Sequence, residues 1–240
     1  MPRFFIENAN EKEIVITGEN AHHIGRSLRM RVGDKLTLCC EGVDYDCVIT
    51  RFTDSEVFCS VVGTAPCESE PKTRLTLFQA LPKGDKAELI VQKAVELGAG
   101  EVVFVMTERC VSRPDEKSFS KRLARLQKIS LEAAKQCGRG AVPKISGLIS
   151  VSELLEGLPR FDKALMCYEK GGSALSAAGV EAGQSIALFI GSEGGFEEKE
   201  AAAFEGAGGE LIGLGKRILR CETAPIAAIS IIMSLAGEME

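Results

Sequence analysis

The stretch Gln184-Ser-Ile-Ala-Leu-Phe-Ile-Gly-Ser-Glu-Gly-Gly-Phe196 decides how the C-terminal part of this chain is expected to fold. Its apolar run, residues 185–190, has the length and composition of a buried strand, and a glycine-rich loop follows it. An acidic, alanine-rich segment (197–206) and a short apolar run (210–214) then precede a second loop, Gly215-Lys-Arg-Ile-Leu-Arg-Cys-Glu-Thr-Ala-Pro225. The order strand, loop, helix, strand, loop, helix predicts an open α/β sheet, whose loops after the carboxyl ends of the strands usually bind ligands. The same glycines would also occur in ordinary turns, so this pattern alone leaves both interpretations open.

The segments before this stretch extend the α/β pattern back to residue 71. Thr73–Leu81 predicts a strand, residues 86–97 predict a helix with Asp85 as its N-cap, and Glu101–Met106 predicts a buried strand. A strand, a helix and a strand within about 35 residues form a βαβ unit, which requires parallel strands. Further elements are expected as helices at 117–137, at 151–157 and from 224 onward, and as a strand at 163–168.

Residues 1–70 predict a smaller, mostly β domain. Short strand-like segments occur at 34–40, 45–51 and 56–62, and the polar segment 65–71, with two prolines, is typical of a linker. The expected domains are therefore 1–70 and 71–240. Asn20 is expected to begin a short helix that places His22, Arg26 and Arg29 on one face, which suits phosphate binding; a solvent-facing turn is the equal alternative.

Composition limits the class of protein and its partners. With 45% hydrophobic and 26% charged residues among 240, the chain has the profile of a soluble globular protein. No apolar run approaches the ~20 residues of a membrane span, and no signal peptide is recognisable, so a cytoplasmic location without a membrane partner is expected. Nine cysteines without a Cys-x-x-Cys pair, and two histidines that are adjacent, predict reduced thiols and no metal site.

Charge is distributed unevenly along the chain. The formal net charge is −5, yet residues 109–144 contain ten Lys or Arg against three Asp or Glu. A basic face of this kind can hold an RNA backbone although the whole protein is acidic, whereas the simpler interpretation is the solvated side of a helix.

Common nucleotide and hydrolase motifs are absent from the sequence. It has no Gly-x-x-x-x-Gly-Lys-Ser/Thr loop, no Gly-x-Gly-x-x-Gly fingerprint after a strand and no Gly-x-Ser-x-Gly elbow. The residues alone therefore predict a ligand-binding α/β domain joined to a small β domain, with a basic surface.

An ordered series of motifs adds a resemblance that covers essentially the whole chain. These motifs are Pro2-Arg-Phe-Phe5, His23-Ile-Gly-Arg-Ser-Leu-Arg29, Lys83-Gly-Asp85, Gln92-Lys-Ala-Val-Glu-Leu-Gly98, Glu132-Ala-Ala-Lys-Gln-Cys-Gly-Arg139, Ile190-Gly-Ser-Glu-Gly-Gly195 and Leu214-Gly-Lys-Arg-Ile-Leu-Arg-Cys-Glu-Thr-Ala224. With them the chain resembles the RsmE family, the small-subunit ribosomal RNA uridine-N3 methyltransferases of the SPOUT superfamily. Two positions depart from the pattern: Ser192 stands where many members have proline, and Pro225 where many have a small apolar residue.

The resemblance implies the following fold, cofactor and partners. An α/β SPOUT methyltransferase domain (71–240) with a trefoil knot would follow a small PUA-like β-barrel domain (1–70). The methyl donor would be S-adenosylmethionine, the substrate small-subunit ribosomal RNA or the 30S particle, and the protein a homodimer. The residues expected to line the cofactor pocket are Leu81, Gly191, Glu193, Gly194, Leu214, Gly215, Ile218 and Leu219.

Three residues of the second loop suit the chemistry of uracil. Uracil N3 must lose a weakly acidic proton, so we expect Arg220 to stabilise charge on the carbonyls, Glu222 to accept the proton and Thr223 to orient the base. A helix-capping role is the alternative for Glu222. The residues expected to contact RNA are Arg3, His23, Arg26, Arg29, Lys83, Arg113 and Arg139. The alternative functions are a SPOUT methyltransferase acting on another ribosomal or transfer RNA position, and an RNA-binding protein without catalysis.

Overall fold

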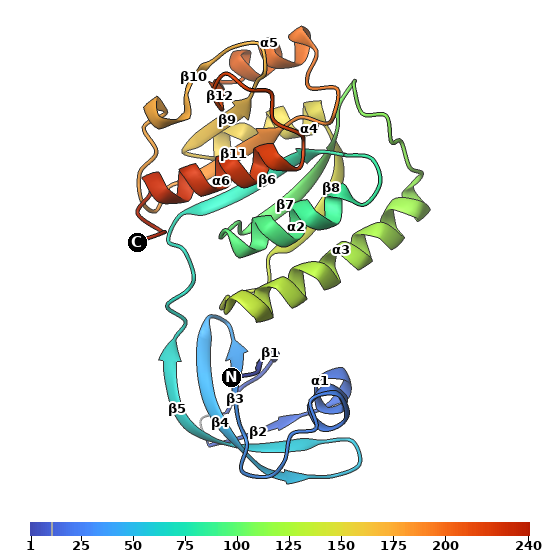
Figure 1. Ribbon diagram of the computed structural model, residues 1–240, viewed down its shortest axis with the longest axis vertical. Coiled ribbons are helices and arrows are strands. Elements are labelled where there is room, and N and C mark those ends of the chain that lie inside the picture. The colour runs from blue at the N-terminus through green and yellow to red at the C-terminus, as the bar shows by residue number, and fades with distance from the viewer. Residues whose placement is uncertain (11) are drawn as a thin grey trace. The chain divides into compact units, whose positions relative to one another are not determined.

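The computed structural model describes residues 1–10 and 12–240, and these residues form two compact units (Figure 1). The N-terminal unit consists of Met1–Glu70 and Ala134–Val142, and the C-terminal unit of Pro71–Ala133 and Pro143–Glu240. The segment 134–142 of the N-terminal unit was not expected from the sequence, because it begins in the last turn of a long helical pattern whose earlier residues belong to the other unit.

A five-stranded sheet forms the N-terminal unit, in the order β1-β3-β4-β5-β2. Its strands are β1 Arg3–Phe5, β2 Glu13–Ile16, β3 Lys35–Cys40, β4 Val43–Phe52 and β5 Val57–Pro66. All pairs are antiparallel except β1 with β3, which is parallel. Alternating side chains such as Leu36, Leu38 and Ile49 are buried beside Phe4, which gives this small unit its own core. The three strands predicted around residues 34–62 are confirmed, whereas β1 and β2 are too short for their pattern to be recognised.

The segment before β3 differs from its prediction. A short helix α1 (Gly18–His22) runs into a π-helix η1 (His23–Ser27), and the N-cap position is occupied by Thr17. Asn20, predicted as the cap, lies inside the helix and donates from Nδ2 to the Phe5 carbonyl oxygen at 3.0 Å. Arg29 has φ +53 and lies outside the helix, so the predicted common helical face of His22, Arg26 and Arg29 is wrong.

Residues 65–70 of the predicted linker belong to the N-terminal unit instead of forming a free linker. Strand β5 continues to Pro66, and the Glu70 carboxylate accepts hydrogen bonds from the backbone N–H groups of Gly140 (2.7 Å) and Ala141 (3.1 Å). The Arg139 guanidinium also pairs with Glu70, at 2.7 Å. These contacts attach the segment 134–142 to the N-terminal unit.

A seven-stranded parallel sheet forms the centre of the C-terminal unit, in the order β10-β12-β9-β11-β6-β7-β8. Its strands are β6 Arg74–Ala80, β7 Glu101–Met106, β8 Lys144–Ser150, β9 Lys163–Cys167, β10 Ser173–Ala174, β11 Ser185–Ile190 and β12 Glu210–Gly213. From β6 the chain adds β7 and β8 on one side and the later strands on the other. The strand order therefore reverses between β6 and β11, which is where open α/β sheets bind ligands.

Helices cover this sheet and complete its core. They are α2 Lys86–Glu96, α3 Glu116–Cys137, α4 Val151–Gly157, α5 Glu198–Gly206 and α6 Thr223–Leu235, with short 3-10 turns η2 Leu158–Arg160 and η3 Leu175–Ala177. Helices α2 and α6 pack against each other in front of the sheet in the view of Figure 1. Asp85 occupies the N-cap position of α2 as predicted, but its side chain makes no capping hydrogen bond. The parallel sheet and the predicted βαβ unit are confirmed.

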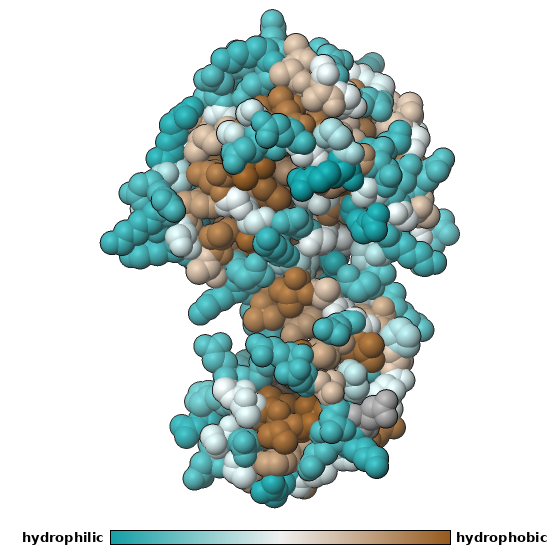
Figure 2. Space-filling model, turned by 180° about the vertical axis from the view of Figure 1, so that it is seen from behind, coloured by the Kyte–Doolittle hydropathy of each residue, from teal (hydrophilic) through white to brown (hydrophobic). Residues whose placement is uncertain are grey.

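Surface hydropathy does not by itself identify a functional face. In the view from behind, apolar patches occur on each unit among polar and charged side chains (Figure 2).

Candidate functional site

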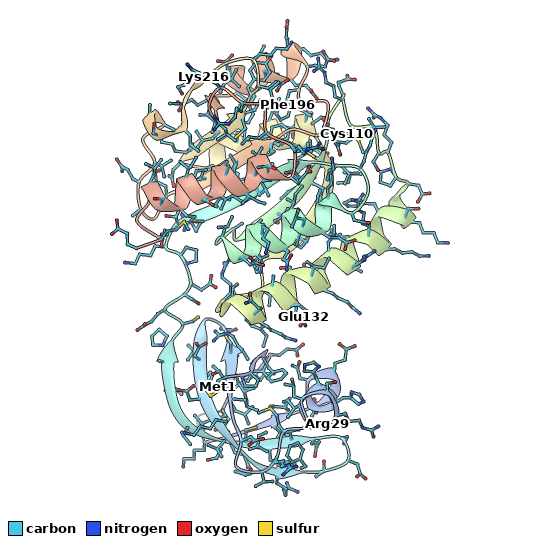
Figure 3. The ribbon with its side chains drawn as sticks, in the orientation of Figure 1. Met1, Arg29, Cys110, Glu132, Phe196 and Lys216 are labelled. Atoms are coloured by element: carbon cyan, nitrogen blue, oxygen red, sulfur yellow. The ribbon has the colours of Figure 1, made fainter. Side chains whose placement is uncertain are left out.

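Three loops meet at the carboxyl edge of the parallel sheet in the C-terminal unit. Leu81 follows β6, the glycine loop (Gly191–Phe196) follows β11, and the arginine loop (Leu214–Glu222) follows β12 and leads into α6. Since these strands are parallel, their carboxyl ends lie at one edge. Phe196 and Lys216, one from each loop, lie at the same end of the unit in Figure 3.

The glycine loop requires glycine at two of its positions. Gly195 has φ +66, and a Cβ atom on it would overlap the Glu169 carboxylate. A Cβ atom on Gly194 would lie 2.9 Å from Cβ of Arg109, closer than real side chains approach. The Gly-Gly pair therefore serves a tight turn against neighbouring chain.

Arg109, from the loop after β7, anchors this turn. Its guanidinium donates to the Gly194 carbonyl oxygen at 2.8 Å and to Oε1 of Glu197 at 2.9 Å. In return, Oγ of the buried Ser192 donates to the Arg109 carbonyl oxygen at 3.4 Å. Ser192 therefore helps to hold the loop although it departs from the family pattern. This role of Arg109 was not predictable from local sequence, because its partners lie 85 and 88 residues away.

The arginine loop presents the apolar side chain of Ile218 to solvent. Gly215 has φ +95 and open space where a Cβ atom would lie. The Ile218 side chain is 87% exposed, while Leu214 and Leu219 are half-buried. An exposed isoleucine beside an open glycine suits a surface that a bound apolar group covers.

Lys86, the first residue of α2, connects the two loops. Its Nζ lies 2.8 Å from Oε1 of Glu193 in the glycine loop and 3.5 Å from Oε2 of Glu222 in the arginine loop. The same oxygen of Glu193 accepts from the Lys83 backbone N–H at 3.2 Å. Nζ also lies 3.7 Å from Sγ of Cys221. Glu193, predicted to bind the cofactor, and Glu222, predicted to act in catalysis, thus share the ammonium group of Lys86. Lys86 was not among the residues predicted from the sequence.

The protonation states in this cluster follow from its contacts. Burial opposes ionisation of Glu222, but hydrogen bonds from its own backbone N–H and from the Cys221 thiol, with the charge of Lys86, lower its pKa. Burial likewise opposes ionisation of Glu193, and its hydrogen bond with Lys86 lowers its pKa. Burial and the neighbouring Glu222 raise the pKa of Cys221 to about 12. At neutral pH the cluster therefore contains two carboxylates, one ammonium group and a neutral thiol, whose Sγ lies 3.3 Å from Oε2 of Glu222.

Glu222 occupies the N-cap position of α6 without acting as a cap. Its side chain makes no capping hydrogen bond and contacts Lys86 and Cys221 instead. The first turn of α6 is closed by the Arg220 carbonyl oxygen, which accepts from the backbone N–H groups of Thr223 (2.8 Å) and Ala224 (2.9 Å). The side chains of Arg220 and Thr223 are exposed.

Gln79, near the end of β6, provides a test of whether a polar ligand fits. Its Nε2 donates to the carbonyl oxygens of Ala80 (3.1 Å) and Gly191 (3.2 Å), while its buried Oε1 has no hydrogen-bond partner among the residues that the structure describes. Exchanging the amide atoms would place an acceptor against two carbonyls, so this orientation is the favourable one. A buried acceptor without a partner is costly unless a ligand or water donates to it. Oε1 of Gln79 therefore fits a ligand that carries an N–H or O–H donor.

Two of the residues predicted to contact RNA are structural. The Arg3 side chain is 10% exposed and pairs with Asp44 at 2.6 Å. The Arg139 side chain is 5% exposed and pairs with Glu70. Because both guanidinium groups are buried in ion pairs within the N-terminal unit, the prediction that they bind RNA is corrected: they hold that unit together.

The other predicted RNA contacts lie at the surface of their units. His23, Arg26 and Arg29 are exposed in and after η1; Figure 3 labels Arg29 at this position. In the C-terminal unit, Lys83 and Arg113 are exposed, and Arg113 donates to the Glu108 carbonyl oxygen at 3.0 Å.

A cavity of about 410 Å³ lies beside β7 and shares no residue with the predicted cofactor site. Its lining residues are Met106, Thr107, Glu108, Arg113, Val151, Lys199, Glu200 and Ala203.

Within residues 1–10 and 12–240, no group of three or more His, Cys, Asp or Glu side chains could hold a metal ion. In the same residues, no helix combines the length and the apolar character needed to cross a membrane.

Comparison with known proteins identifies the family. The model described as "RNA methyltransferase domain" matches residues 68–233, and "RNA methyltransferase PUA domain" matches residues 16–62. The ribosomal RNA small subunit methyltransferase E of Bacillus subtilis (strain 168) is 36% identical, covering 97% of this chain and 96% of that protein. The protein of that name from Mesomycoplasma hyopneumoniae (strain 232) is 30% identical over 94% of this chain and 96% of its own length.

A solved structure agrees with these matches over nearly the whole chain. The ribosomal RNA small subunit methyltransferase E of Neisseria gonorrhoeae, bound to S-adenosyl methionine, superposes with a TM-score of 0.88 at 30% identity, covering 98% of each chain. The predicted fold class is confirmed for the SPOUT α/β methyltransferase domain and for the small PUA-like β domain before it. The trefoil knot and the closure of the small sheet into a barrel stay predictions of the family resemblance. The chain belongs to the ribosomal RNA small subunit methyltransferase E family.

Proposed function

We propose that this protein transfers the methyl group of S-adenosylmethionine to N3 of a uridine in small-subunit ribosomal RNA. The observation that carries the proposal is the meeting of the glycine and arginine loops at the strand-order reversal, joined through Lys86, in a chain of this family. The relatives are named as ribosomal RNA small subunit methyltransferases, and the Neisseria structure contains S-adenosyl methionine.

The cofactor would lie between the two loops. Gly191 and Gly194 belong to the glycine loop assigned to the pocket, and Gly215 has open space through which a ligand could approach the backbone closely. Ile218 and Leu219 would cover the adenine ring. Oε1 of Gln79 is available to a donor on the ligand. The remaining residues assigned to the pocket are Leu81, Glu193 and Leu214. When bound, the cofactor supplies a methyl group on a positively charged sulfonium, which makes the methyl carbon electrophilic.

The arginine loop would act on the uracil. Glu222, ionised at neutral pH, accepts the N3 proton or relays it to solvent, while exposed Arg220 stabilises negative charge on the uracil carbonyls. The N3 lone pair then forms the bond to the methyl carbon as the carbon–sulfur bond breaks. Because the lowered pKa makes Glu222 a weak base, the charge stabilisation by Arg220 supplies an essential part of the driving force. Thr223 would orient the base.

Basic side chains would hold the RNA while the target base leaves its stack. The candidates retained are His23, Arg26 and Arg29 in the N-terminal unit and Lys83 and Arg113 in the C-terminal unit. All five are exposed, which phosphate contacts require.

The proposal includes a homodimer that works in the cytoplasm, where its RNA substrate would be. Support for a dimer comes from α6, where Ile231 and Leu235 are exposed one turn apart on one face. Light scattering on the purified protein should give twice the monomer mass, and Ile231→Glu with Leu235→Glu should reduce it to that of a monomer. An unchanged dimer would assign the interface elsewhere.

Two measurements test the proposed function against its alternatives. Calorimetry with S-adenosylmethionine should give one site per chain; no binding would favour an RNA-binding protein without catalysis. Methylation of 30S particles, free small-subunit RNA and transfer RNA, followed by nucleoside mass spectrometry, should give 3-methyluridine in small-subunit RNA only. Methyl transfer to transfer RNA, or to another atom, would contradict the proposed substrate.

A further inference from the structure

The contacts of Lys86 differ from those of the other lysines paired in the C-terminal unit. Lys93, Lys170 and Lys199 each pair with one glutamate. Lys86 faces two glutamates from two different loops, at 2.8 Å (Glu193) and 3.5 Å (Glu222). One side chain thus links the segment assigned to the cofactor with the segment assigned to the substrate.

Lys86 and its two glutamate partners are each held in place by further contacts. Lys86 is the first residue of α2, which packs against α6, and Glu222 immediately precedes α6. Oε1 of Glu193 is also held by the Lys83 backbone N–H at 3.2 Å, and Oε2 of Glu222 lies 3.3 Å from the Cys221 thiol. The ammonium group is therefore the single cation within ion-pair distance of either carboxylate among the described residues.

We propose that Lys86 is a positioning residue for methyl transfer, whose ammonium group holds the carboxylates of Glu193 and Glu222 and thereby aligns the two loops. This inference rests on the proposed function, and it assigns to Lys86 no contact with the RNA or the methyl donor. One positive and two negative charges leave the cluster with a net charge of −1, which suits a site that must accept a sulfonium cation.

Removal of the Lys86 ammonium group should raise the pKa of Glu222. The groups next to the Glu222 carboxylate are the Lys86 ammonium group and the Cys221 thiol. The Glu193 carboxylate lies on the same ammonium group. Without Lys86 the two carboxylates lose their common counter-charge, so protonation of Glu222 becomes easier and its pKa rises. The carboxylate form, present at neutral pH, would then be lost at a higher pH as the solution is acidified.

The test reads Glu222 directly and does not require activity. The full-length protein, labelled with ¹³C at the glutamate carboxyl carbons, is titrated by NMR, with the Glu222 signal assigned from Glu222→Gln. In Lys86→Met the Glu222 midpoint should rise by about one pH unit, and Lys86→Arg should restore it. Lys93→Met, which breaks a one-to-one pair two turns along the same helix, should leave it unchanged. Thermal melting of each variant verifies folding.

The pH dependence of single-turnover methylation then connects this group to the reaction. The acidic limb of the profile should move upward with the Glu222 midpoint in Lys86→Met and return in Lys86→Arg. A Glu222 midpoint that does not move in folded Lys86→Met overturns the inference. A midpoint that moves without any change in the methylation profile also overturns it. An inactive wild-type protein whose Glu222 midpoint still responds to Lys86 would count instead against the proposed function.

Discussion

Glu222 is the residue on which the proposed chemistry depends most. In Glu222→Gln, the amide cannot accept the N3 proton, so the single-turnover rate of methylation should fall by about 100-fold or more. Cofactor affinity should remain within about twofold, because the proposed contact is with the uracil. Rapid-quench kinetics with cofactor bound measures the rate, and Glu205→Gln, an exposed change on α5, is the control. A full single-turnover rate in Glu222→Gln would eliminate its role as proton acceptor.

At the residue scale, the sequence indicated the loops better than the contacts inside them. The residues assigned to the cofactor and to catalysis came from motif positions, and the structure places them in loops at one edge of the sheet. Lys86, Gln79 and Arg109 were not identified, because the partners that define their roles lie between 85 and 135 residues away along the chain. Arg3 and Arg139 were assigned to RNA because arginine is typical of phosphate contacts, whereas burial next to Asp44 and Glu70 gives them structural roles.

The segment formed by α1 and η1 is the element that we expect to contact RNA in the N-terminal unit. Replacing Arg26 and Arg29 together with Gln should weaken RNA binding and reduce the slope of log K against log salt by about 1.4, at about 0.7 per phosphate contact on single strands. Filter binding between 50 and 200 mM salt measures both quantities.

The control for this double change removes the same charge from the other unit. Arg74→Gln with Arg160→Gln, two exposed positions in the C-terminal unit, should alter affinity slightly and leave the slope near the wild-type value. Equal slopes in the Arg26/Arg29 variant and the wild type would refute this assignment.

The segment 134–142 should contribute to the stability of the N-terminal unit through Arg139. Since breaking a buried ion pair strands a charge, and Glu70 is partly exposed, Arg139→Met should cost about 2 kcal/mol of unfolding free energy. Burial opposes ionisation of Glu70, but Arg139 and two backbone N–H groups lower its pKa. The stabilisation is therefore present above the ordinary glutamate pKa and lost as the pH falls through the lowered value. Urea unfolding at pH 7 and pH 3 measures it; an equal cost in exposed Arg160→Met would contradict this explanation.

At the element scale, buried strands and amphipathic helices were predictable, and irregular elements were not. The predicted bounds of β7 and α4 match the structure, because each is a compact run ended by polar or glycine residues. Strand β8 was missed since Gly147, at φ +78, accompanies a register shift against β7 that interrupts the alternation. The π-helix η1 was also unpredictable, because nothing in local propensity distinguishes it from an α-helix.

At the scale of the whole molecule, periodicity predicted a parallel α/β unit and a small β unit, and the family resemblance added the rest. The order β10-β12-β9-β11-β6-β7-β8 places β11, late in the sequence, next to β6, and periodicity contains no information about that order. The trefoil knot that the resemblance implies is likewise outside what general topology rules predict. The attachment of 134–142 to the N-terminal unit depends on contacts of Glu70, which local sequence does not reveal.

Mass spectrometry of ribosomal RNA nucleosides from cells with and without this gene tests the central claim most directly. The account predicts that 3-methyluridine disappears from small-subunit RNA in the deletion strain, returns with the wild-type gene and stays absent with Glu222→Gln. Unchanged 3-methyluridine in the deletion strain, or the loss of a different modified nucleoside, would contradict the claim that this protein methylates uridine N3.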